Sequence, residues 1–404
     1  MPSAAATILR RSSETVCVAR GIRGSGTECR ARRLRRETMD KTGIEVKRVV
    51  PLRVLATLRR VTGQEEILAA IAELRPQLAD VVAGPPMALR LGFPRDGKVD
   101  VEIAFPIARA VKRKGFALKV LPALPMFSLT HVGPVVGGPE GANLIDTRKK
   151  LVQFVNERNI LVGDDPERFL YHEGAETHGD RTDQYVTEVQ YSYHMPMWLE
   201  ALDEGTKRFA GPEAARRVMA GSEGLAEALD GPRAVAWIPG AMERLDREVT
   251  DERARACIMN GCAHHYIVQS RMIVEAAFKE VGKDLRSLVA KITNEKLLGS
   301  KYWIDESGPQ PLLMILRRPA RPEEYEKAMT PAEKRYEACF CPLVRDAIRE
   351  GREISRTFCH CSGGWYAQEW AIVFGEAPEV RLVETMLEGK DACLFAVVIP
   401  NGWL

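Results

Sequence analysis

Two strand-like stretches with a glutamate at their centre decide the expected fold: Val99-Asp-Val-Glu-Ile-Ala-Phe105 and Tyr185-Val-Thr-Glu-Val-Gln-Tyr191. Each closes a similar series of expected elements, an apolar strand, a helix and then two strands, over residues 53–105 and 126–191. A β-α-β-β unit cannot bury its open sheet face alone, so two copies should leave a groove between them. The sequence therefore predicts an α+β fold with a ligand cleft.

The helices of the two units are predicted from apolar residues at three- and four-residue steps. One spans residues 64–83 and the other residues 140–157. Pro76 interrupts the first, and because proline lacks a backbone N–H it should kink or split that helix.

Strand alternation puts Val101, Ile103 and Phe105 on the face that the helices should cover. Glu102 and Glu188 then point toward the groove or toward water, the usual fate of a strand glutamate. For Glu188 the sequence favours ligand binding, since a carboxylate near several tyrosines can hold a cation against aromatic rings. The candidate ligand-binding residues are Glu188, Glu102, Tyr171, Tyr185, Tyr191, Tyr193 and Phe105.

A catalytic alternative uses the same cleft. Glu188 would activate water as a base, and Tyr191 or Tyr171 would donate a proton to the leaving atom of a strained or heterocyclic substrate. Spacing alone does not separate this hydrolase from passive binding.

The distribution of charge limits the possible partners. The net charge is +3, but residues 1–36 contribute +7, which leaves −4 for the remainder. An acidic body argues against nucleic acid as a partner. The leader, residues 1–40, is Arg-rich and superficially similar to a mitochondrial transit peptide; the favoured interpretation is a disordered tail, or a start at Met39. No apolar run of ~20 residues predicts a membrane span.

The second half should begin after a linker at residues 195–211, with helices and then an α+β region over residues 212–404. Seven of the nine cysteines follow residue 256, and their uneven spacing favours a reducing, cytoplasmic setting. Two Cys-x-Cys pairs could meet in a tetrahedral zinc site, although free cysteines are commonly buried small hydrophobes. The candidate metal ligands are Cys339, Cys341, Cys359, Cys361 and Cys393.

Residues 44–193 resemble the GyrI-like small-molecule-binding domain, the effector module of AraC- and MerR-type multidrug regulators. The motifs that carry the resemblance are Gly84-Pro-Pro-Met-Ala-Leu89, Val99-Asp-Val-Glu-Ile-Ala-Phe-Pro106, Thr130-His-Val-Gly-Pro134 and Val186-Thr-Glu-Val-Gln190. The resemblance implies a cleft for flat, hydrophobic, often cationic ligands, with a buried glutamate on the last strand as counter-ion. Glu188 occupies that position.

Residues 340–400 resemble the end of a vinyl-reductase-type sensor domain and its thiazoline-carboxylate-hydrolase-like relatives. The similar motifs are Phe358-Cys-His-Cys-Ser-Gly-Gly-Trp365, Phe374-Gly-Glu-Ala-Pro-Glu-Val380 and Gly389-Lys-Asp-Ala-Cys-Leu-Phe395. In metal-binding members a glutamate and three cysteines hold zinc. Here Thr385 stands where the middle cysteine would be, which puts that zinc site in doubt.

The sequence therefore predicts a small-molecule-binding protein for a hydrophobic, neutral or cationic ligand. No helix-turn-helix pattern precedes residue 44, so no DNA-binding domain of its own is expected. A hydrolase and a thiol- or zinc-based sensor remain the alternatives. Neither the ligand nor the oligomeric state follows from the sequence.

Overall fold

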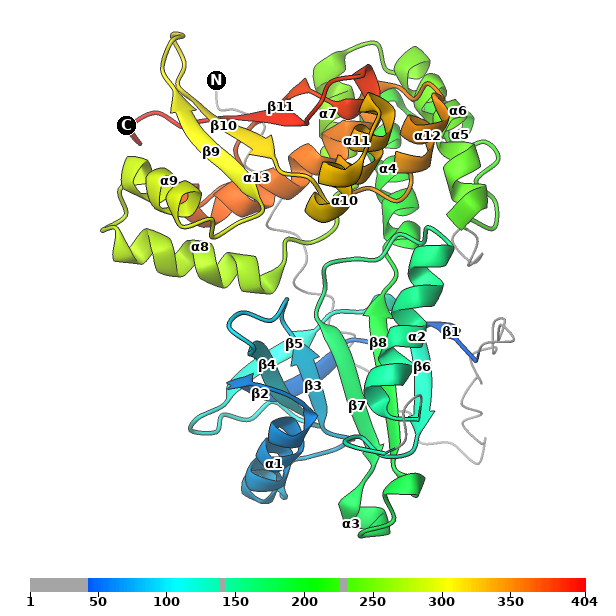
Figure 1. The fold of residues 1–404 in the computed structure, drawn as a ribbon, viewed down its shortest axis with the longest axis vertical. Helices are drawn as coiled ribbons and strands as arrows, with labels where there is room; N and C mark the ends of the chain where they lie inside the picture. The colour runs from blue at the N-terminus through cyan, green and yellow to red at the C-terminus, as the bar shows by residue number, and fades with distance from the viewer. Residues whose placement is uncertain (1–42, 139–141, 226–230) are drawn as a thin grey trace, which may run out of the picture. The chain divides into compact units, whose positions relative to one another are not determined.

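The computed structural model describes residues 43–138, 142–225 and 231–404 (Figure 1). The leader predicted at residues 1–40 lies outside the described residues. Within them, no helix is both long and apolar enough to cross a membrane.

The first half, residues 43–192, is an antiparallel sheet with helices on one face. Its elements are β1 Glu45–Val49, β2 Leu52–Val61, α1 Gln64–Leu74, β3 Met87–Arg90, β4 Val99–Pro106, β5 Ala117–Leu121, β6 Leu124–Val132, α2 Leu144–Glu157, β7 Glu167–Glu173, α3 Ala175–His178 and β8 Val186–Ser192. The eight strands follow the order β1-β6-β8-β7-β3-β4-β2-β5. Read outward from the β7–β3 pair, the order is β8, β6, β1 on one side and β4, β2, β5 on the other.

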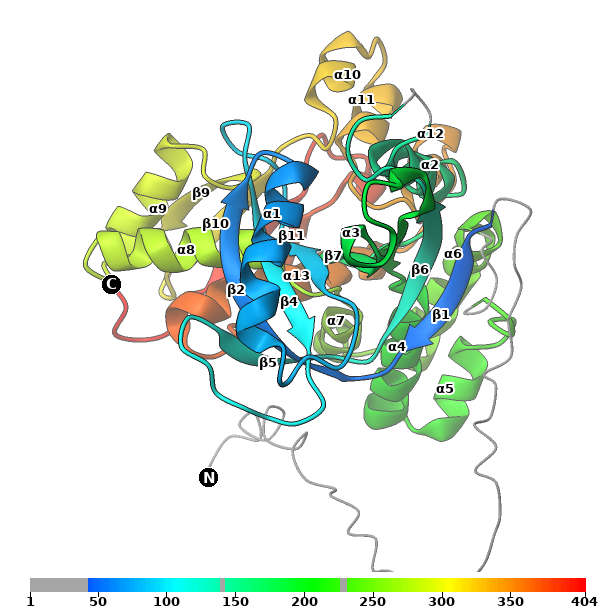
Figure 2. The same cartoon turned by 90° about the horizontal axis from the view of Figure 1, so that it is seen from below.

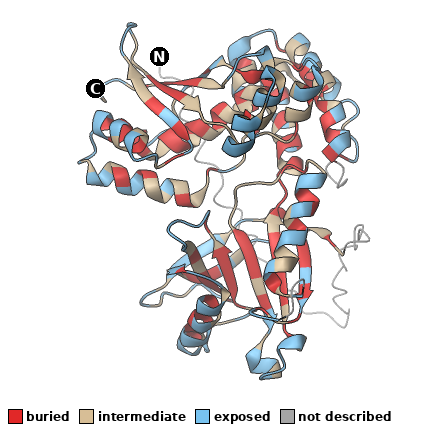
Figure 3. Ribbon diagram, viewed as in Figure 1, coloured by how far each residue is buried: buried red, intermediate tan, exposed pale blue. Residues whose placement is uncertain are grey.

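The sheet has an outer face, which α1 and α2 cover, and an inner face on the opposite side (Figures 1 and 2). Alternation sends Leu55, Ile103 and Phe127 to the outer face, where they share one buried cluster with Ile71 of α1 and Leu151 of α2. The α+β class is confirmed. Figure 3 shows that the central strands of this sheet are largely buried, whereas parts of α1 are exposed.

Two details of the first half differ from expectation. Helix α1 ends at Leu74 and a 3-10 turn continues to Leu78, so the helix is shorter than residues 64–83. Pro76 explains the change, since its missing N–H cannot continue the α-helical ladder. The edge strands β1 and β5 were not expected at all.

The second half, residues 195–404, contains ten helices and a four-stranded sheet among its described residues. Its elements are α4 Met195–Ala210, α5 Pro212–Val218, α6 Gly231–Glu248, α7 Glu252–Gly261, α8 Val268–Glu280, α9 Leu285–Asn294, β9 Ser300–Asp305, β10 Leu312–Arg317, α10 Pro322–Lys327, α11 Pro331–Ala338, α12 Arg345–Glu350, α13 His360–Phe374, β11 Val380–Glu384 and β12 Leu394–Val398. The sheet order is β11-β12-β10-β9, and α13 packs beside it (Figure 1).

The segment expected to link two domains is instead helix α4. Its residues Trp198 and Leu202 are almost fully buried and belong to the same cluster as the outer-face core of the sheet. Residues 252–280 form two helices and not one, because the chain leaves the helix after Gly261 and re-enters it at Val268. The two halves are therefore joined by packed helices, and α4 is part of the core.

Gly364 on α13 lies against the backbone of α7. A Cβ at this position would lie 2.0 Å from the carbonyl oxygen of Asn260, so neither helix can yield without moving its backbone. We expect Gly364→Ala to destabilise the protein by about 3 kcal/mol, at the upper end of overpacking costs. Chemical denaturation measures this directly. Gly261→Ala, with open space around its Cβ, is the matched control and should be neutral or slightly stabilising. Equal stabilities of the two variants would contradict this packing.

Candidate functional site

Glu188 is the centre of a buried polar cluster on the inner face of the sheet. It lies in the middle of β8, is 5% exposed, and accepts hydrogen bonds from Ser128 and from Gln190 Nε2, the latter at 2.8 Å. His172 Nε2 lies 3.1 Å from its other oxygen, and Lys47 forms an ion pair with it. The carboxylate is therefore sheltered and fully engaged by side chains of four strands.

These contacts set the ionisation of Glu188. Burial alone would raise its pKa, but hydrogen bonds from His172, Gln190, Lys47 and Ser128 lower the pKa well below the usual range. The group is thus a permanent anion at neutral pH, as a counter-ion for a cation must be.

Lys47 reaches Glu188 from the edge strand β1, across β6. The register pairs Lys47 with Met126, and Met126 with Ser192, which places Lys47 on the inner face with Glu188. The same arrangement occurs at the other end of the sheet, where Lys119 on edge strand β5 forms an ion pair with Glu102 of β4. Each central glutamate therefore has a lysine from the outermost strand as its cation.

The Glu188 cluster opens to solvent on one side. The side chains of Lys47 and His172 are each 38% exposed, and Thr130, which pairs directly with Glu188 across the β6–β8 ladder, is exposed. Leu170, the partner of Glu188 on β7, is partly exposed and lies beside Met87 of β3. A small molecule could approach the carboxylate along this rim and meet apolar surface at Leu170.

The predicted tyrosines do not surround Glu188. Tyr191 alternates with Glu188 on β8, so it lies on the outer face, where its hydroxyl donates to Glu167 Oε1 at 2.7 Å. Tyr171 is likewise on the outer face and donates to Gln64 Oε1 at 2.6 Å. The expected pairing of Glu188 with Tyr191 as catalytic base and acid is therefore wrong, since the sheet separates them.

The remaining aromatic candidates are also engaged elsewhere. Tyr185 donates to the carbonyl of Gly179 at 2.7 Å, and the ring of Tyr193 packs on Phe127 at 4.5 Å between centroids. Phe105 is completely buried in the outer-face core and cannot contact a ligand on the inner face. The aromatic-walled hollow expected around Glu188 is absent from the described residues.

Sequence reasoning missed a buried carboxylate, Glu167, which lies on the outer face of the sheet with Tyr191. Glu167, 7% exposed, accepts from Arg148 Nε at 2.7 Å and lies 3.6 Å from Arg90 Nη1. With Tyr191 as a third partner, its charge is satisfied by the fold. We assign this network a structural role.

The inner face of the first unit is covered by the second half of the chain. Val54, Met87 and Leu89 form a small apolar cluster with Val268 and Met272 of α8. Gln269 fastens this contact, donating to the carbonyl of Phe93 at 2.7 Å and accepting from its N–H at 3.0 Å. The groove expected between the two units is therefore partly filled by α8, and the Glu188 end is the part that keeps an open rim.

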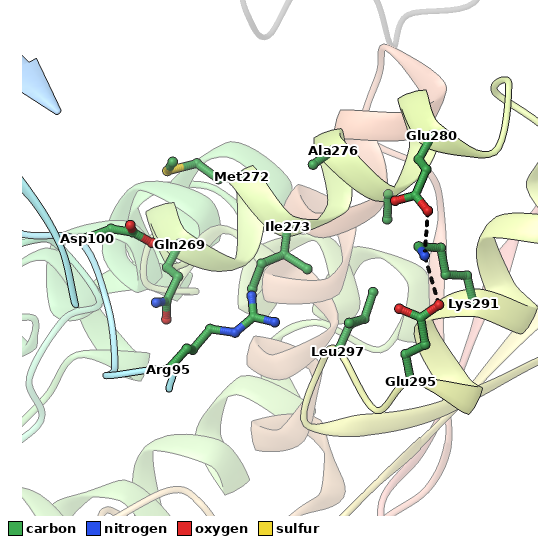
Figure 4. A pocket seen from close by; sticks show the side chains of 11 residues that line it. Arg95, Asp100, Gln269, Met272, Ile273, Ala276, Glu280, Lys291, Glu295 and Leu297 are labelled. Atoms are coloured by element: carbon green, nitrogen blue, oxygen red, sulfur yellow. Dashed lines mark hydrogen bonds and ion pairs between the residues drawn. The ribbon is translucent and has the colours of Figure 1, made fainter. Parts of the chain in front are cut away.

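A separate hollow of about 260 Å³ lies beside this contact, between the β3–β4 hairpin and helices α8 and α9 (Figure 4). Arg95 and Asp100 face it from the hairpin, while Met272, Ile273 and Leu297 give it an apolar wall. At its far end Lys291 bonds Glu280 and Glu295, each at 2.8 Å. None of the residues expected from the sequence to bind a ligand lines this hollow.

The cysteines of the second half gather without forming a metal site. Thr385 donates to Cys359 Sγ at 3.0 Å and lies 3.9 Å from Cys393 Sγ, so a hydroxyl stands between these two thiols. Across the described ranges, no group of three or more His, Cys, Asp or Glu side chains is arranged to hold a metal ion. The described residues therefore do not bring Cys339, Cys341, Cys359, Cys361 and Cys393 together as the expected zinc ligands.

No family model and no curated protein matches this chain. Solved structures resemble parts of it at low identity. The C-terminal domain of EcmrR is 18% identical with a TM-score of 0.32, over 37% of this chain and 95% of that one. SAV2435 bound to tetraphenylphosphonium is 15% identical with a TM-score of 0.28, over 37% and 92%.

A hydrolase encoded by lin2189 from Listeria innocua is 14% identical with a TM-score of 0.26, over 38% of this chain and 92% of that one. The match to EcmrR in a complex with DNA spans only 56% of the EcmrR chain, at 17% identity and a TM-score of 0.33. These scores are low, and the resemblance covers less than half of this chain.

Proposed function

We propose that this protein binds a small hydrophobic cation at the inner-face rim, with Glu188 as the counter-ion and Lys47 as the cation that the ligand replaces. The observation that carries the proposal is an ionised carboxylate, 5% exposed, whose lysine partner reaches it from an edge strand and stays 38% exposed. This refines the GyrI-like interpretation of the sequence, in which the glutamate of the last strand meets a ligand's charge.

Exchange of Lys47 for a ligand is energetically reasonable. A lysine gains little from a partly exposed ion pair, because its ammonium is strongly hydrated and its stem is flexible. A hydrophobic cation loses less hydration on entering the site and gains apolar contact with the partly exposed Leu170. Lys47 then moves into water while Glu188 keeps a positive partner.

The geometry does not favour hydrolysis at this site. The hydroxyl of Tyr191 is bonded to Glu167 on the outer face, so it cannot donate to a leaving atom beside Glu188. His172 is the only other titratable group on the described residues that contacts Glu188 besides Lys47, and it holds the carboxylate. Binding is therefore the function that these contacts support best.

Tetraphenylphosphonium, a hydrophobic cation that cannot donate hydrogen bonds, is a suitable probe. We expect Glu188→Gln to weaken its binding by at least tenfold, about 1.4 kcal/mol, because the amide keeps the shape but removes the charge. Isothermal titration calorimetry on wild type and variant measures this. Triphenylphosphine oxide, neutral and similarly shaped, should bind both proteins equally weakly.

Glu102→Gln is the matched control, since Glu102 has the same position in its unit and the same kind of lysine partner. It should leave the affinity unchanged, because Glu102 lies on β4, which β3 and β7 separate from the strand that carries Glu188. Full binding to Glu188→Gln, or equal losses in both variants, would refute the assignment of Glu188 as the counter-ion.

A further inference from the structure

Arg317, the last residue of β10, forms no ion pair with any of the described residues. Its guanidinium lies 3.9 Å from the ring centre of Phe340, 5.7 Å from that of Trp365 and 6.0 Å from that of Tyr366. Glu369 is the carboxyl near enough for Arg317 to lower its pKa, but it is buried and makes no ion pair with the guanidinium, which belongs to a partly buried residue. The aromatic rings therefore hold the guanidinium in place, while its N–H groups remain available to an anion.

The thiols near Arg317 do not supply the missing anion. Burial raises the pKa of Cys339 and of Cys341 to about 12, and Arg317 offsets that rise only in part. Cys361 behaves in the same way, with burial raising its pKa to about 12. All three are neutral at pH 7, so they surround the guanidinium as weakly polar walls and not as counter-ions.

We propose that Arg317 is the anchor of a second ligand site, which takes a small carboxylate with an apolar or aromatic body. A guanidinium fork matches the two oxygens of a carboxylate, and the exposed ring of Phe340 and the partly exposed ring of Trp365 provide apolar contact for the rest of the molecule. A singly charged, planar anion suits one arginine. Arg321, which lies four residues further along the chain, is held by Glu337 and adds no free charge for a phosphate.

This site is independent of Glu188. It lies in the second half, and its residues come from β10, the segment around Phe340 and the start of α13. The thiols give it a direct reporter, because Cys339 and Cys341 flank Phe340, whose ring lies on Arg317. An anion seated on Arg317 should hinder access to both sulfurs.

The experiment follows alkylation by the neutral reagent N-ethylmaleimide with peptide mass spectrometry. Phenylacetate at tenfold over its dissociation constant should slow modification of Cys339 and Cys341 about tenfold. Phenylacetamide, its neutral twin, should give no protection. Cys257 is exposed and serves as the internal control, which neither compound should protect.

Three variants locate the effect. Arg317→Gln should abolish the protection, Arg317→Lys should weaken it because an ammonium cannot bind both oxygens in a fork, and Arg318→Gln should leave it intact. A melting curve shows which variants fold. Protection that persists in Arg317→Gln, or in Arg317→Lys at full strength if the glutamine variant does not fold, overturns the proposal. Equal protection by phenylacetamide does the same.

Discussion

Glu369→Gln is expected to raise the free energy of unfolding by about 3 kcal/mol more at pH 8 than at pH 4. Glu369 lies on α13 and is 1% exposed, and neither of its carboxyl oxygens has a hydrogen-bond partner. Burial raises its pKa to about 7; Tyr302, Tyr266 and Arg317 are near enough to oppose the shift but do not cancel it.

The sign follows from linkage. In the unfolded chain this carboxyl ionises near 4.5, whereas in the folded protein it stays protonated to about pH 7. Its favourable contribution is fully present below pH 4.5 and is lost as the pH rises through 7. The difference between the pKa of Glu369 in the folded and unfolded states corresponds to a loss of about 3 kcal/mol of stability. Glutamine does not suffer this loss because it has no charge to bury.

Urea denaturation of wild type and Glu369→Gln between pH 4 and pH 8 measures the difference. Glu376→Gln, on the exposed turn after the same helix, is the control for the substitution itself. A gap for Glu369→Gln that stays constant across this range would mean that the carboxyl does not titrate between the two values.

Lys47→Met is expected to lower the free energy of unfolding at pH 7 by about 2 kcal/mol. Breaking a buried ion pair by removing one partner costs about 3–5 kcal/mol, and the partial exposure of Lys47 reduces that figure. Methionine keeps most of the aliphatic stem, so the loss reports the charge. Arg48→Met, at an exposed neighbouring position, should change stability little.

A double-mutant cycle separates the pair from its surroundings. Once Glu188 is glutamine, no buried carboxylate remains to be neutralised, so Lys47→Met should then cost far less. Equal costs in both backgrounds would contradict the ion pair as the source of the effect.

The sequence predicted the strand–helix–strand–strand order of the first half because its periodicities are clear. It also placed Glu188 and Glu102 correctly on the face away from the apolar residues, since alternation depends only on neighbouring positions. The prediction that tyrosines surround Glu188 was wrong for the same reason. Tyr191 and Tyr193 stand an odd number of residues from Glu188, so they had to lie on the other face, and closeness in sequence was mistaken for closeness in space.

The true neighbours of Glu188 depend on strand pairing, which a single sequence does not specify. Ser128 and His172 reach it from β6 and β7, and Lys47 from a strand that lies outside both units. One signal was available. The five-residue stretches Glu45–Val49 and Ala117–Leu121 each contain valine and carry a lysine at their centre, and lysine is common on edge strands.

In the second half, the sequence indicates features that depend only on residues close together in the chain, such as the end of a helix. Gly375 ends α13 in the left-handed conformation, as a helix-terminating glycine should, with φ of 81°. The cysteine spacing could not show that Thr385 stands between Cys359 and Cys393, nor that Arg317 lies beside Phe340. Those contacts join four separate segments, and only the tertiary fold brings them together.

The most direct measurement of the central claim is the affinity of Lys47→Met for tetraphenylphosphonium. If the ligand takes the place of Lys47, removing the lysine leaves Glu188 without its cation, and the affinity should rise about tenfold over wild type. Lys119→Met, the equivalent change beside Glu102, should bind like wild type. An unchanged or weaker affinity in Lys47→Met would contradict the exchange of lysine for ligand at Glu188.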